Sequence, residues 1–265
     1  MDFSFENLNY KEIEQNIVEF IRSFADGKKI VMGLSGGIDS SLSANLAVKA
    51  LGKDSVKVVI VKNTQFTKEG IDTAMAYSKR IGAETQEVDT EGMCDNLFKN
   101  LNINNPNLIL KATVDVRICD LILRTIAQTE NRLYMGTINS TERIVGWYPK
   151  ATLTGDFCPI GGLLKHQLKG MAKYLGLEDL AEGVSEDASI VCGGCGELPE
   201  FKNIPYVTLD TALYLYETTA DNNLQEQLDR YGITQDQWKT IKNRIESVRH
   251  KSEVFPKFRA INTKL

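Results

Sequence analysis

Histidine is scarce in this chain of 265 residues, which has only two, His166 and His250. A Ser-His-Asp triad and a histidine-rich metal site are therefore not expected. Proline is also scarce, with six residues, and they form no cluster that would mark a linker between domains. No apolar run approaches the roughly 18–20 residues that a membrane span needs, so we expect no contact with a membrane.

Charge of either sign is not in strong excess. The chain has 31 Lys and Arg against 35 Asp and Glu, a formal net charge of −4, so no global basic field attracts nucleic acid. The first residues, MDFSFENLNYKEIEQN, are acidic and polar and predict neither a signal peptide nor a transit peptide. Five cysteines, an odd number without a secretion signal, indicate a reducing compartment, and we expect a cytoplasmic protein.

Hydrophobic patterning alternates between strands and helices through the first half of the chain. We expect strands at about 29–34, 56–61, 84–88 and 133–137, with helices at 12–24, 41–51, 68–81, 91–101 and 108–128. This alternation predicts an α/β fold, a doubly wound parallel sheet with helices on both faces. From about 163 to 265 the pattern is mainly helical, with helices at 163–175, 206–216 and 235–248, and we expect a single domain over 1–265. The stretch 181–204 has little periodicity and is typical of a long loop.

The strongest local signal is Gly33-Leu34-Ser35-Gly36-Gly37-Ile38-Asp39-Ser40-Ser41, between a predicted strand and a predicted helix. Its glycines permit a tight turn, and the amides at the start of the helix form an anion site. Asp39 would repel a lone phosphate, but it suits a Mg²⁺ ligand beside a polyphosphate. The loop lacks the lysine of a GxxxxGKS/T motif, and the chain has no GxGxxG, so a kinase-type P-loop and a Rossmann dinucleotide site are disfavoured.

This loop resembles the SGGxDS signature of the N-type ATP pyrophosphatases, Rossmann-like enzymes that split ATP between its α and β phosphates and adenylate a substrate. The alternative, a Gly-Ser turn without a ligand, is disfavoured because the motif and its strand-to-helix context agree. The resemblance implies contacts with ATP for these residues of the loop: Gly33, Ser35, Gly36, Gly37, Asp39 and Ser40.

Within that superfamily, the later residues are most similar to ammonia-dependent NAD synthetase, with a match from about Ile30 to Lys251. Gly136-Thr137-Ile138-Asn139-Ser140-Thr141-Glu142 resembles the family's strand that ends in GT, with a Glu five residues after the Thr. The resemblance implies that Thr137 contacts ATP and that Glu142 binds Mg²⁺. Asp39 and Glu142 also both follow predicted parallel strands, so the two carboxylates could share one metal. Taken alone, Glu142 is equally well explained as an acidic residue favoured at a helix N-terminus.

Two further residues match positions at which the family contacts ATP. Lys165, in Lys165-His166-Gln167, resembles the lysine of the family's K-x-Q, which contacts ATP phosphate, and Ser185 lies about where the family has a threonine. The resemblance thus implies a catalytic group of Asp39, Glu142 and Lys165. Read alone, Lys165 is more simply a solvated charge on a helix face.

Other matches imply contacts with deamido-NAD. They fall at positions where the family binds this dinucleotide: Arg117, Lys150, Asp156, His250 and Lys251. Between Lys150 and Asp156, however, the family's six residues YGDGGA are replaced by the shorter Ala151-Thr152-Leu153-Thr154-Gly155. A paralogue that amidates a different carboxylate is therefore the first alternative.

Cysteines depart from the family pattern. Cys192 and Cys195 form a CxxC where the family usually has an acidic loop, and Cys158 lies in the substrate segment. One CxxC is half of a zinc site, and three cysteines are typical of sulfur-inserting ATP pyrophosphatases that hold a 4Fe–4S cluster. Reduced thiols, a Zn or Fe–S site, and redox or sulfur chemistry all stay open.

The resemblance implies an AMP-forming ligase that makes a C–N bond, with ATP and Mg²⁺. A carboxylate, most simply deamido-NAD, would be adenylated and then attacked by ammonia, giving NAD. The family implies a homodimer, and a match that uses nearly the whole chain leaves no room for a glutaminase domain. Two alternatives from other classes are a sulfur-inserting enzyme and a non-catalytic nucleotide-binding module, and the first of these conflicts with the acidic net charge if its substrate is tRNA.

Overall fold

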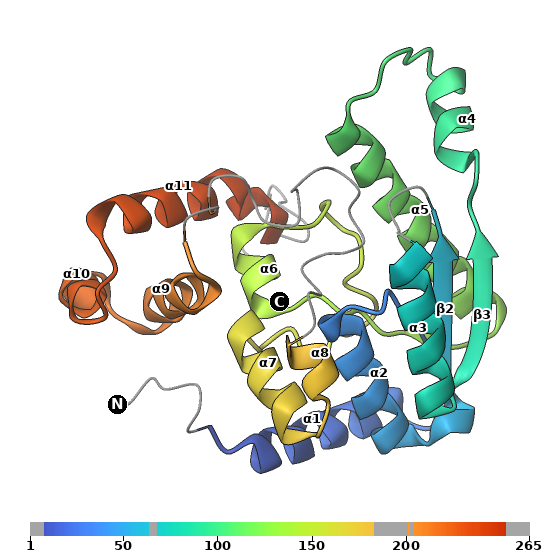
Figure 1. Ribbon diagram of the computed structural model, residues 1–265, viewed down its shortest axis with the longest axis horizontal. Helices are drawn as coiled ribbons and strands as arrows, with labels where there is room; N and C mark the ends of the chain where they lie inside the picture. Colours follow the sequence, from blue (N-terminus) through green and yellow to red (C-terminus); the bar gives the residue numbers. More distant parts are fainter. Residues whose placement is uncertain (1–7, 64–67, 183–200, 202–203, 253–265) are drawn as a thin grey trace, which may run out of the picture.

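The computed structural model describes residues 8–63, 68–182, 201 and 204–252, and all structural statements below concern this part of the chain. Its centre is a four-stranded parallel sheet with the strand order β3-β2-β1-β4 (Figure 1). The strands are β1 (Ile30–Gly33), β2 (Val56–Lys62), β3 (Glu84–Asp89) and β4 (Leu133–Tyr134). All four predicted strands are confirmed, although β4 is shorter than expected.

Helices cover both faces of the sheet, as the patterning predicts. On one face, α2 (Ile38–Leu51) and α3 (Lys68–Ile81) contact the sheet. The same hydrophobic core extends to α1 (Tyr10–Ala25), α7 (Lys165–Tyr174) and α8 (Glu178–Glu182), which pack against α2. The other face packs against α5 (Leu108–Thr129), which contacts α4 (Met93–Asn100). Within β2, Val58 and Ile60 belong to the first core and Val59 and Val61 to the second, because successive side chains of a strand point to opposite faces.

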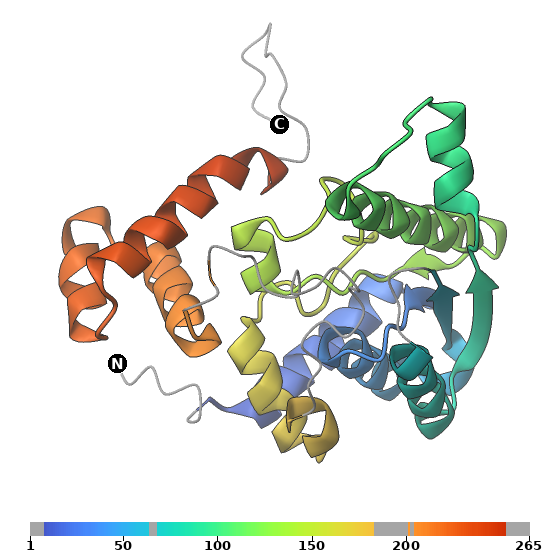
Figure 2. The same cartoon turned by 45° about the horizontal axis from the view of Figure 1, so that its top comes forward.

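The remaining helices are α6 (Ser140–Val145), α9 (Tyr206–Thr218), α10 (Asp221–Arg230) and α11 (Gln235–Ser252). Figures 1 and 2 show α9, α10 and α11 as a group on the side of α6 and α7 that is away from the sheet. These three helices share a separate hydrophobic core, which also takes in Val145 of α6 and Leu164 just before α7. We call this group the helical lobe, and the expectation that the whole chain is one domain stays a prediction. No helix in the described ranges is long and apolar enough to cross a membrane.

The sheet has one topological switch point, between β1 and β4. From β1 the chain moves outward through β2 to β3, and it then returns to place β4 on the other side of β1. Ligands of open α/β sheets bind beyond the carboxyl ends of the strands at such a point. The glycine-rich loop leaves β1 here, and the segment that leads to α6 leaves β4 here, so the topology brings these two sequence motifs together.

A glycine contact holds the segment 151–157 against the end of β4. The Gly136 N–H donates to Phe157 O at 2.8 Å, and the Asp156 N–H donates to Tyr134 O at 2.7 Å. A Cβ on Gly136 would overlap the backbone of Thr154, and a Cβ on Gly155 would overlap that of Tyr134. Glycine at both positions therefore allows the two backbones to touch.

Candidate active site

The glycine-rich loop is closed by a contact between Ser35 and Ser40. The Ser35 N–H donates to Ser40 Oγ at 3.1 Å, and the two hydroxyl oxygens lie 3.0 Å apart. Gly36 has a φ of +83°, and a Cβ there would lie 2.9 Å from Gly70 O of α3, so a side chain is excluded. Gly37 is the N-cap of α2 and forms no side-chain cap. The amides of the first turn of α2 are thus presented to an anion beyond the sheet edge.

Asn139 links the two predicted metal ligands. Its side-chain amide Nδ2 donates to Asp39 Oδ1 at 2.8 Å, and its Oδ1 accepts the Glu142 N–H at 2.9 Å. Glu142 Oε2 in turn accepts the Asn139 N–H at 3.2 Å, which completes a capping box at the start of α6. Asn139 is fully buried, so the two carboxylates are held from within the protein.

Lys165 brings a positive charge to the same place. Its Nζ pairs with Asp39 Oδ2, and Lys165 is a buried residue with 7% exposure. The structure therefore gathers the three residues predicted to be catalytic, Asp39, Glu142 and Lys165, at the switch point. Thr137, predicted to contact ATP, lies half-buried between β4 and Asn139.

A buried carboxylate that the sequence analysis did not single out lies behind this group. Asp210 of α9 is 0% exposed; its Oδ1 accepts a hydrogen bond from Thr141 Oγ1 at 2.6 Å and its Oδ2 accepts the His166 N–H at 2.7 Å. Thr141 Oγ1 itself accepts the Lys165 N–H at 2.9 Å. Burial raises the pKa of Asp210 to about 6, against the hydrogen bonds from Thr141 and His166, which lower it. The sequence signal that could have identified it was an aspartate that falls among the apolar positions of a predicted helix.

Two of the five predicted substrate residues, Arg117 and Lys251, contact the segment 146–150, which contains a third, Lys150. Lys251 Nζ donates to Gly146 O at 2.7 Å and to Tyr148 O at 3.0 Å, and Arg117 Nη1 donates to Lys150 O at 3.4 Å. Burial lowers the pKa of Lys251, and the positive charges of Arg244 and Arg117 lower it further. Such a concentration of positive charge suits an anionic ligand.

The other two predicted substrate residues are placed differently. Asp156 Oδ2 accepts the Tyr134 N–H at 2.8 Å, so its carboxylate is bonded to β4. His250 is an exposed residue near the end of α11. Ser185, Cys192 and Cys195 lie outside the described residues.

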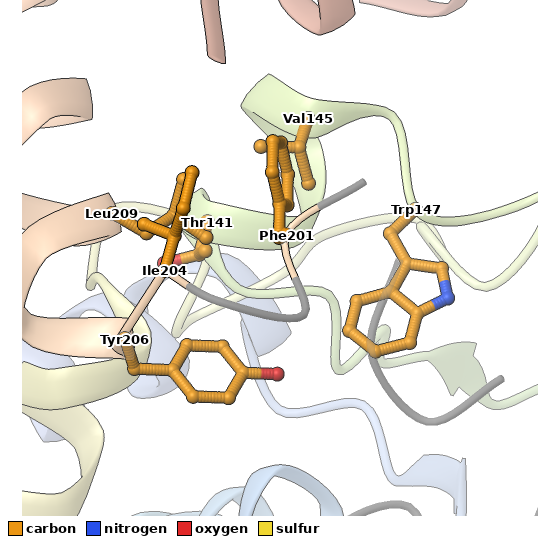
Figure 3. Close-up of a pocket in the computed structure, with 7 residues that line it drawn as sticks. All are labelled: Thr141, Val145, Trp147, Phe201, Ile204, Tyr206 and Leu209. Atoms are coloured by element: carbon orange, nitrogen blue, oxygen red, sulfur yellow. The ribbon is translucent and has the colours of Figure 1, made fainter. Parts of the chain in front are cut away.

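A small pocket lies between α6 and the start of α9 (Figure 3). It is mostly apolar, and in that view the Tyr206 ring lies at the lower left and the Trp147 ring at the right. Its lining residues are Thr141, Val145, Trp147, Phe201, Ile204, Tyr206 and Leu209. Since Thr141 and Leu209 belong to it, the pocket adjoins the hydrogen bond between Thr141 and Asp210.

Cys158, the described member of the predicted cysteine site, is engaged as a neutral thiol. Its Sγ donates to Ile138 O at 3.0 Å, and burial raises its pKa to about 12. Within the described ranges, no three His, Cys, Asp or Glu side chains form a group that could hold a metal ion. The Zn or Fe–S prediction therefore has no support among these residues.

Asp39 and Glu142 nevertheless fit Mg²⁺ as it is usually bound in nucleotide sites. This ion takes one or two protein carboxylates, and its remaining ligands are water and substrate phosphates. Both residues offer hard oxygen donors beside an anion-binding loop, and Asn139 holds them in relation to each other. The pair therefore suits a metal that arrives with a polyphosphate.

A parallel sheet with a glycine-rich loop and two carboxylates at its switch point defines an α/β nucleotide-binding protein. Within that class the chain belongs to the NAD synthase family, whose model matches residues 9–255. The resemblance, and with it the class of ligase that forms a C–N bond with ammonia, is confirmed. Enzymes of this family generally use ATP and Mg²⁺.

Relatives match over most of the chain. The NH(3)-dependent NAD(+) synthetase of Methanosarcina mazei is 31% identical over 256 residues, which are 94% of this chain and 98% of that one. That of Staphylothermus marinus is 32% identical over 217 residues, 78% of this chain and 77% of its own.

Two solved structures share the fold. The NH3-dependent NAD synthetase from Campylobacter jejuni, in complex with the nitrate ion, has a TM-score of 0.78 at 24% identity and covers 95% of this chain and 100% of its own. The NMN synthetase from Francisella tularensis has a TM-score of 0.79 at 20% identity, with 96% and 100% covered.

Proposed function

We propose that this protein converts deamido-NAD to NAD, with ammonia as the nitrogen source and with ATP cleaved to AMP and pyrophosphate. The observation that carries the proposal is the link between Asp39 and Glu142 through Asn139, beside the glycine-rich loop. It supports a site for Mg·ATP at the switch point. The family and its ammonia-dependent relatives support the amidation.

The first half-reaction activates the carboxylate. A carboxylate oxygen attacks the α phosphorus of ATP, the bond from that phosphorus to the bridging oxygen breaks, and pyrophosphate leaves. The amides at the start of α2 and the Lys165 ammonium stabilise negative charge on the phosphates without having to move. Mg²⁺ held by Asp39 and Glu142 supplies further neutralisation of that charge when it is bound.

The second half-reaction forms the amide. Ammonia attacks the carbonyl carbon of the acyl-adenylate, the carbon–oxygen bond to AMP breaks, and the added nitrogen loses a proton. We assign no general base to this step, because holding ammonia and the acyl-adenylate together can supply much of the acceleration. Arg117, Lys150 and Lys251 are proposed to hold the phosphates of the dinucleotide at the segment 146–150.

A related carboxylate is the second candidate substrate. The family's six residues YGDGGA are shortened here to residues 151–155, and this segment packs against β4 through Gly136 and Gly155. The fold is also shared with an NMN synthetase. Nicotinic acid mononucleotide, the carboxylate that corresponds to NMN, is therefore the alternative to test first.

Pyrophosphate release from Mg·ATP tests the proposal. Deamido-NAD and ammonium are each supplied or omitted, nicotinic acid mononucleotide replaces deamido-NAD in a parallel series, and the product is identified by mass. Release that requires both deamido-NAD and ammonium, with NAD formed, is the expected result. If only nicotinic acid mononucleotide is amidated, it is the substrate in place of deamido-NAD. Pyrophosphate release with neither carboxylate present would contradict the proposed reaction.

The proposal includes a homodimer formed through α4 and the start of α5. Large apolar side chains are exposed there: Met93, Leu97, Leu101, Leu108 and Ile109. Figure 1 shows α4 and this end of α5 projecting beyond the sheet. Sedimentation should give a dimer for the wild type and for the control Val207→Lys, which is exposed on α9, and a monomer for Ile109→Lys. A dimer that survives Ile109→Lys would place the interface elsewhere.

A cytoplasmic location is also part of the proposal. It follows from the odd cysteine count, and the three cysteines in the described ranges, Cys94, Cys119 and Cys158, are free thiols.

A further inference from the structure

We infer that Asp210 is a positioning residue for Lys165, acting through the beginning of α7. Asp210 touches no part of the loop or of the Asp39–Glu142 pair; its contacts are with Thr141 and with the backbone of His166. The role of Lys165 as a phosphate ligand is part of the proposed function, and the inference rests on it. The hydrogen bonds that carry the inference are independent of the substrate.

The start of α7 is capped by other helices. Its N-cap residue, Leu164, has an apolar side chain and cannot accept a hydrogen bond. The first two N–H groups of the helix instead reach Thr141 Oγ1 of α6, at 2.9 Å from Lys165, and Asp210 Oδ2 of α9, at 2.7 Å from His166. These amides would otherwise lack partners in a buried place, so Thr141 and Asp210 decide where α7 begins.

Thr141 and Asp210 act as one unit. The Thr141 hydroxyl donates to Asp210 Oδ1 at 2.6 Å and accepts the Lys165 N–H, so its single proton is committed to the aspartate. Asp210 is 0% exposed and Thr141 is 2% exposed. A buried carboxylate is expensive unless its oxygens are hydrogen-bonded, and here both are. The helix N-terminus adds a favourable dipole for the negative charge.

This arrangement fixes the backbone position from which the Lys165 side chain extends. The Lys165 Nζ is held at Asp39, and the residue is 7% exposed, so its ammonium has little room to compensate for a shift of the backbone. A misplacement of about 1 Å at a reacting group can cost about 10²-fold in rate. Because Asp210 belongs to α9, the helical lobe sets the position of the lysine at the switch point.

The test is a double-mutant cycle read as the Kd for Mg·ATP by calorimetry, without carboxylate or ammonia. Asp210→Asn keeps the shape but offers one accepting oxygen in place of two, so either the Thr141 hydroxyl proton or the His166 N–H loses its acceptor. We expect Asp210→Asn to weaken binding by about 5- to 20-fold and Lys165→Met by at least as much. In the Lys165→Met background, Asp210→Asn should weaken binding by less than about twofold, since coupled sites are not additive.

Two outcomes would overturn the inference. Asp210→Asn could bind Mg·ATP within about twofold of the wild type, or it could weaken the Lys165→Met protein as much as it weakens the wild type. Glu14→Gln is the matched control: it removes another buried carboxylate, in α1, whose partner is Lys49. It should leave the Kd unchanged, which separates positioning from a general effect of lost charge.

A second pair of variants covers the case in which Asp210→Asn does not fold. Thr141→Ser keeps the hydroxyl and should bind Mg·ATP within about twofold of the wild type, whereas Thr141→Val should bind about fivefold or more weakly. Equal affinities for these two would also overturn the inference. If the cycle shows the coupling but the wild type makes no NAD, the proposed function alone is refuted. If the wild type makes NAD but the cycle shows no coupling, the inference alone is refuted.

Discussion

Asn139 Nδ2 donates a hydrogen bond to Asp39 Oδ1 at 2.8 Å, across 100 positions of the chain. The same side chain caps α6 by accepting the Glu142 N–H at 2.9 Å. One buried amide therefore orients a carboxylate that follows β1 and a carboxylate that follows β4. Partners of this kind fix metal ligands before the metal arrives, and their removal typically costs 10- to 100-fold in metal affinity.

Replacing Asn139 should accordingly raise the requirement for Mg²⁺. Asn139→Ala loses both bonds, whereas Asn139→Ser can still cap α6 but cannot reach Asp39. We expect both variants to need about tenfold more Mg²⁺ for half-maximal pyrophosphate release, because both leave Asp39 unsupported. A titration with Mg²⁺ at saturating ATP measures this. A wild-type Mg²⁺ curve for Asn139→Ser would show that only the helix cap matters.

Glycine at position 136 should be required for an intact site. A Cβ at this position would enter the backbone of Leu153 and Thr154, so Gly136→Ala should displace the segment 151–157 and lower activity by about 10²-fold. Gly162→Ala is the matched control, because a Cβ there meets nothing within 4 Å. Kinetics of the two variants, with circular dichroism to verify folding, make the comparison. Equal activities would contradict the glycine contact.

The sheet and the loop are the parts that sequence patterning predicts well. The strand β1 and the residues 58–61 of β2 are continuous apolar runs, because both faces of the sheet are buried there, and such runs are easily recognised. The short or polar helices α6, α8 and α10 were not predicted, because each has too few turns or too few apolar residues to show a period. Since α6 carries Glu142, the geometry of the metal pair could not be derived from spacing alone.

Lys251 should matter for the carboxylate substrate more than for ATP. Its Nζ holds the carbonyls of Gly146 and Tyr148, so Lys251→Met frees the segment 146–150 and removes a positive charge. We expect the KM for deamido-NAD to rise by about tenfold, with the KM for ATP within about twofold of the wild type. Lys242→Met, on the same helix and exposed, should change neither. A rise in the KM for ATP alone would contradict the assignment.

The sequence could not predict which residues, distant from each other in the chain, are joined by hydrogen bonds. Matching residue types placed Asp156 among the substrate residues, but the structure bonds its carboxylate to the Tyr134 N–H. Asp210 stands among Leu209, Ala212 and Leu213, and its helical spacing alone predicts a core position. The spacing does not predict its hydrogen-bond partners, Thr141 and the His166 N–H, and these are what connect Asp210 to the start of α7.

Cys158 should be dispensable for chemistry. Its thiol is partly buried and donates to Ile138 O, and its pKa is raised to about 12, so it is neither a thiolate nucleophile nor a ready metal ligand at neutral pH. Cys158→Ser can form the same hydrogen bond, and we expect activity within about threefold of the wild type. Metal analysis of both proteins provides the second readout. Bound iron or zinc that is lost in Cys158→Ser, together with lost activity, would instead support the sulfur-inserting alternative.

Asp210 should also give the stability of the protein a dependence on pH. Burial raises its pKa from 3.8 to about 6 in the folded state, so between these values the folded protein binds a proton more tightly than the unfolded chain does. This contribution to the free energy of unfolding is fully present below about pH 4 and is lost as the pH rises through about 6. Each pKa unit corresponds to about 1.4 kcal/mol, so the loss is on the order of 3 kcal/mol.

Asp210→Asn removes this titration and is therefore the proper reference. Urea unfolding of both proteins, at low concentration and at several pH values between about 4 and 7, gives the difference in their free energies of unfolding. We expect the wild type to lose stability relative to Asp210→Asn as the pH rises. Other groups titrate equally in both proteins, so their contributions cancel in the difference. A difference that stays constant with pH would mean that the hydrogen bonds from Thr141 and His166 stabilise the carboxylate enough to offset its burial fully.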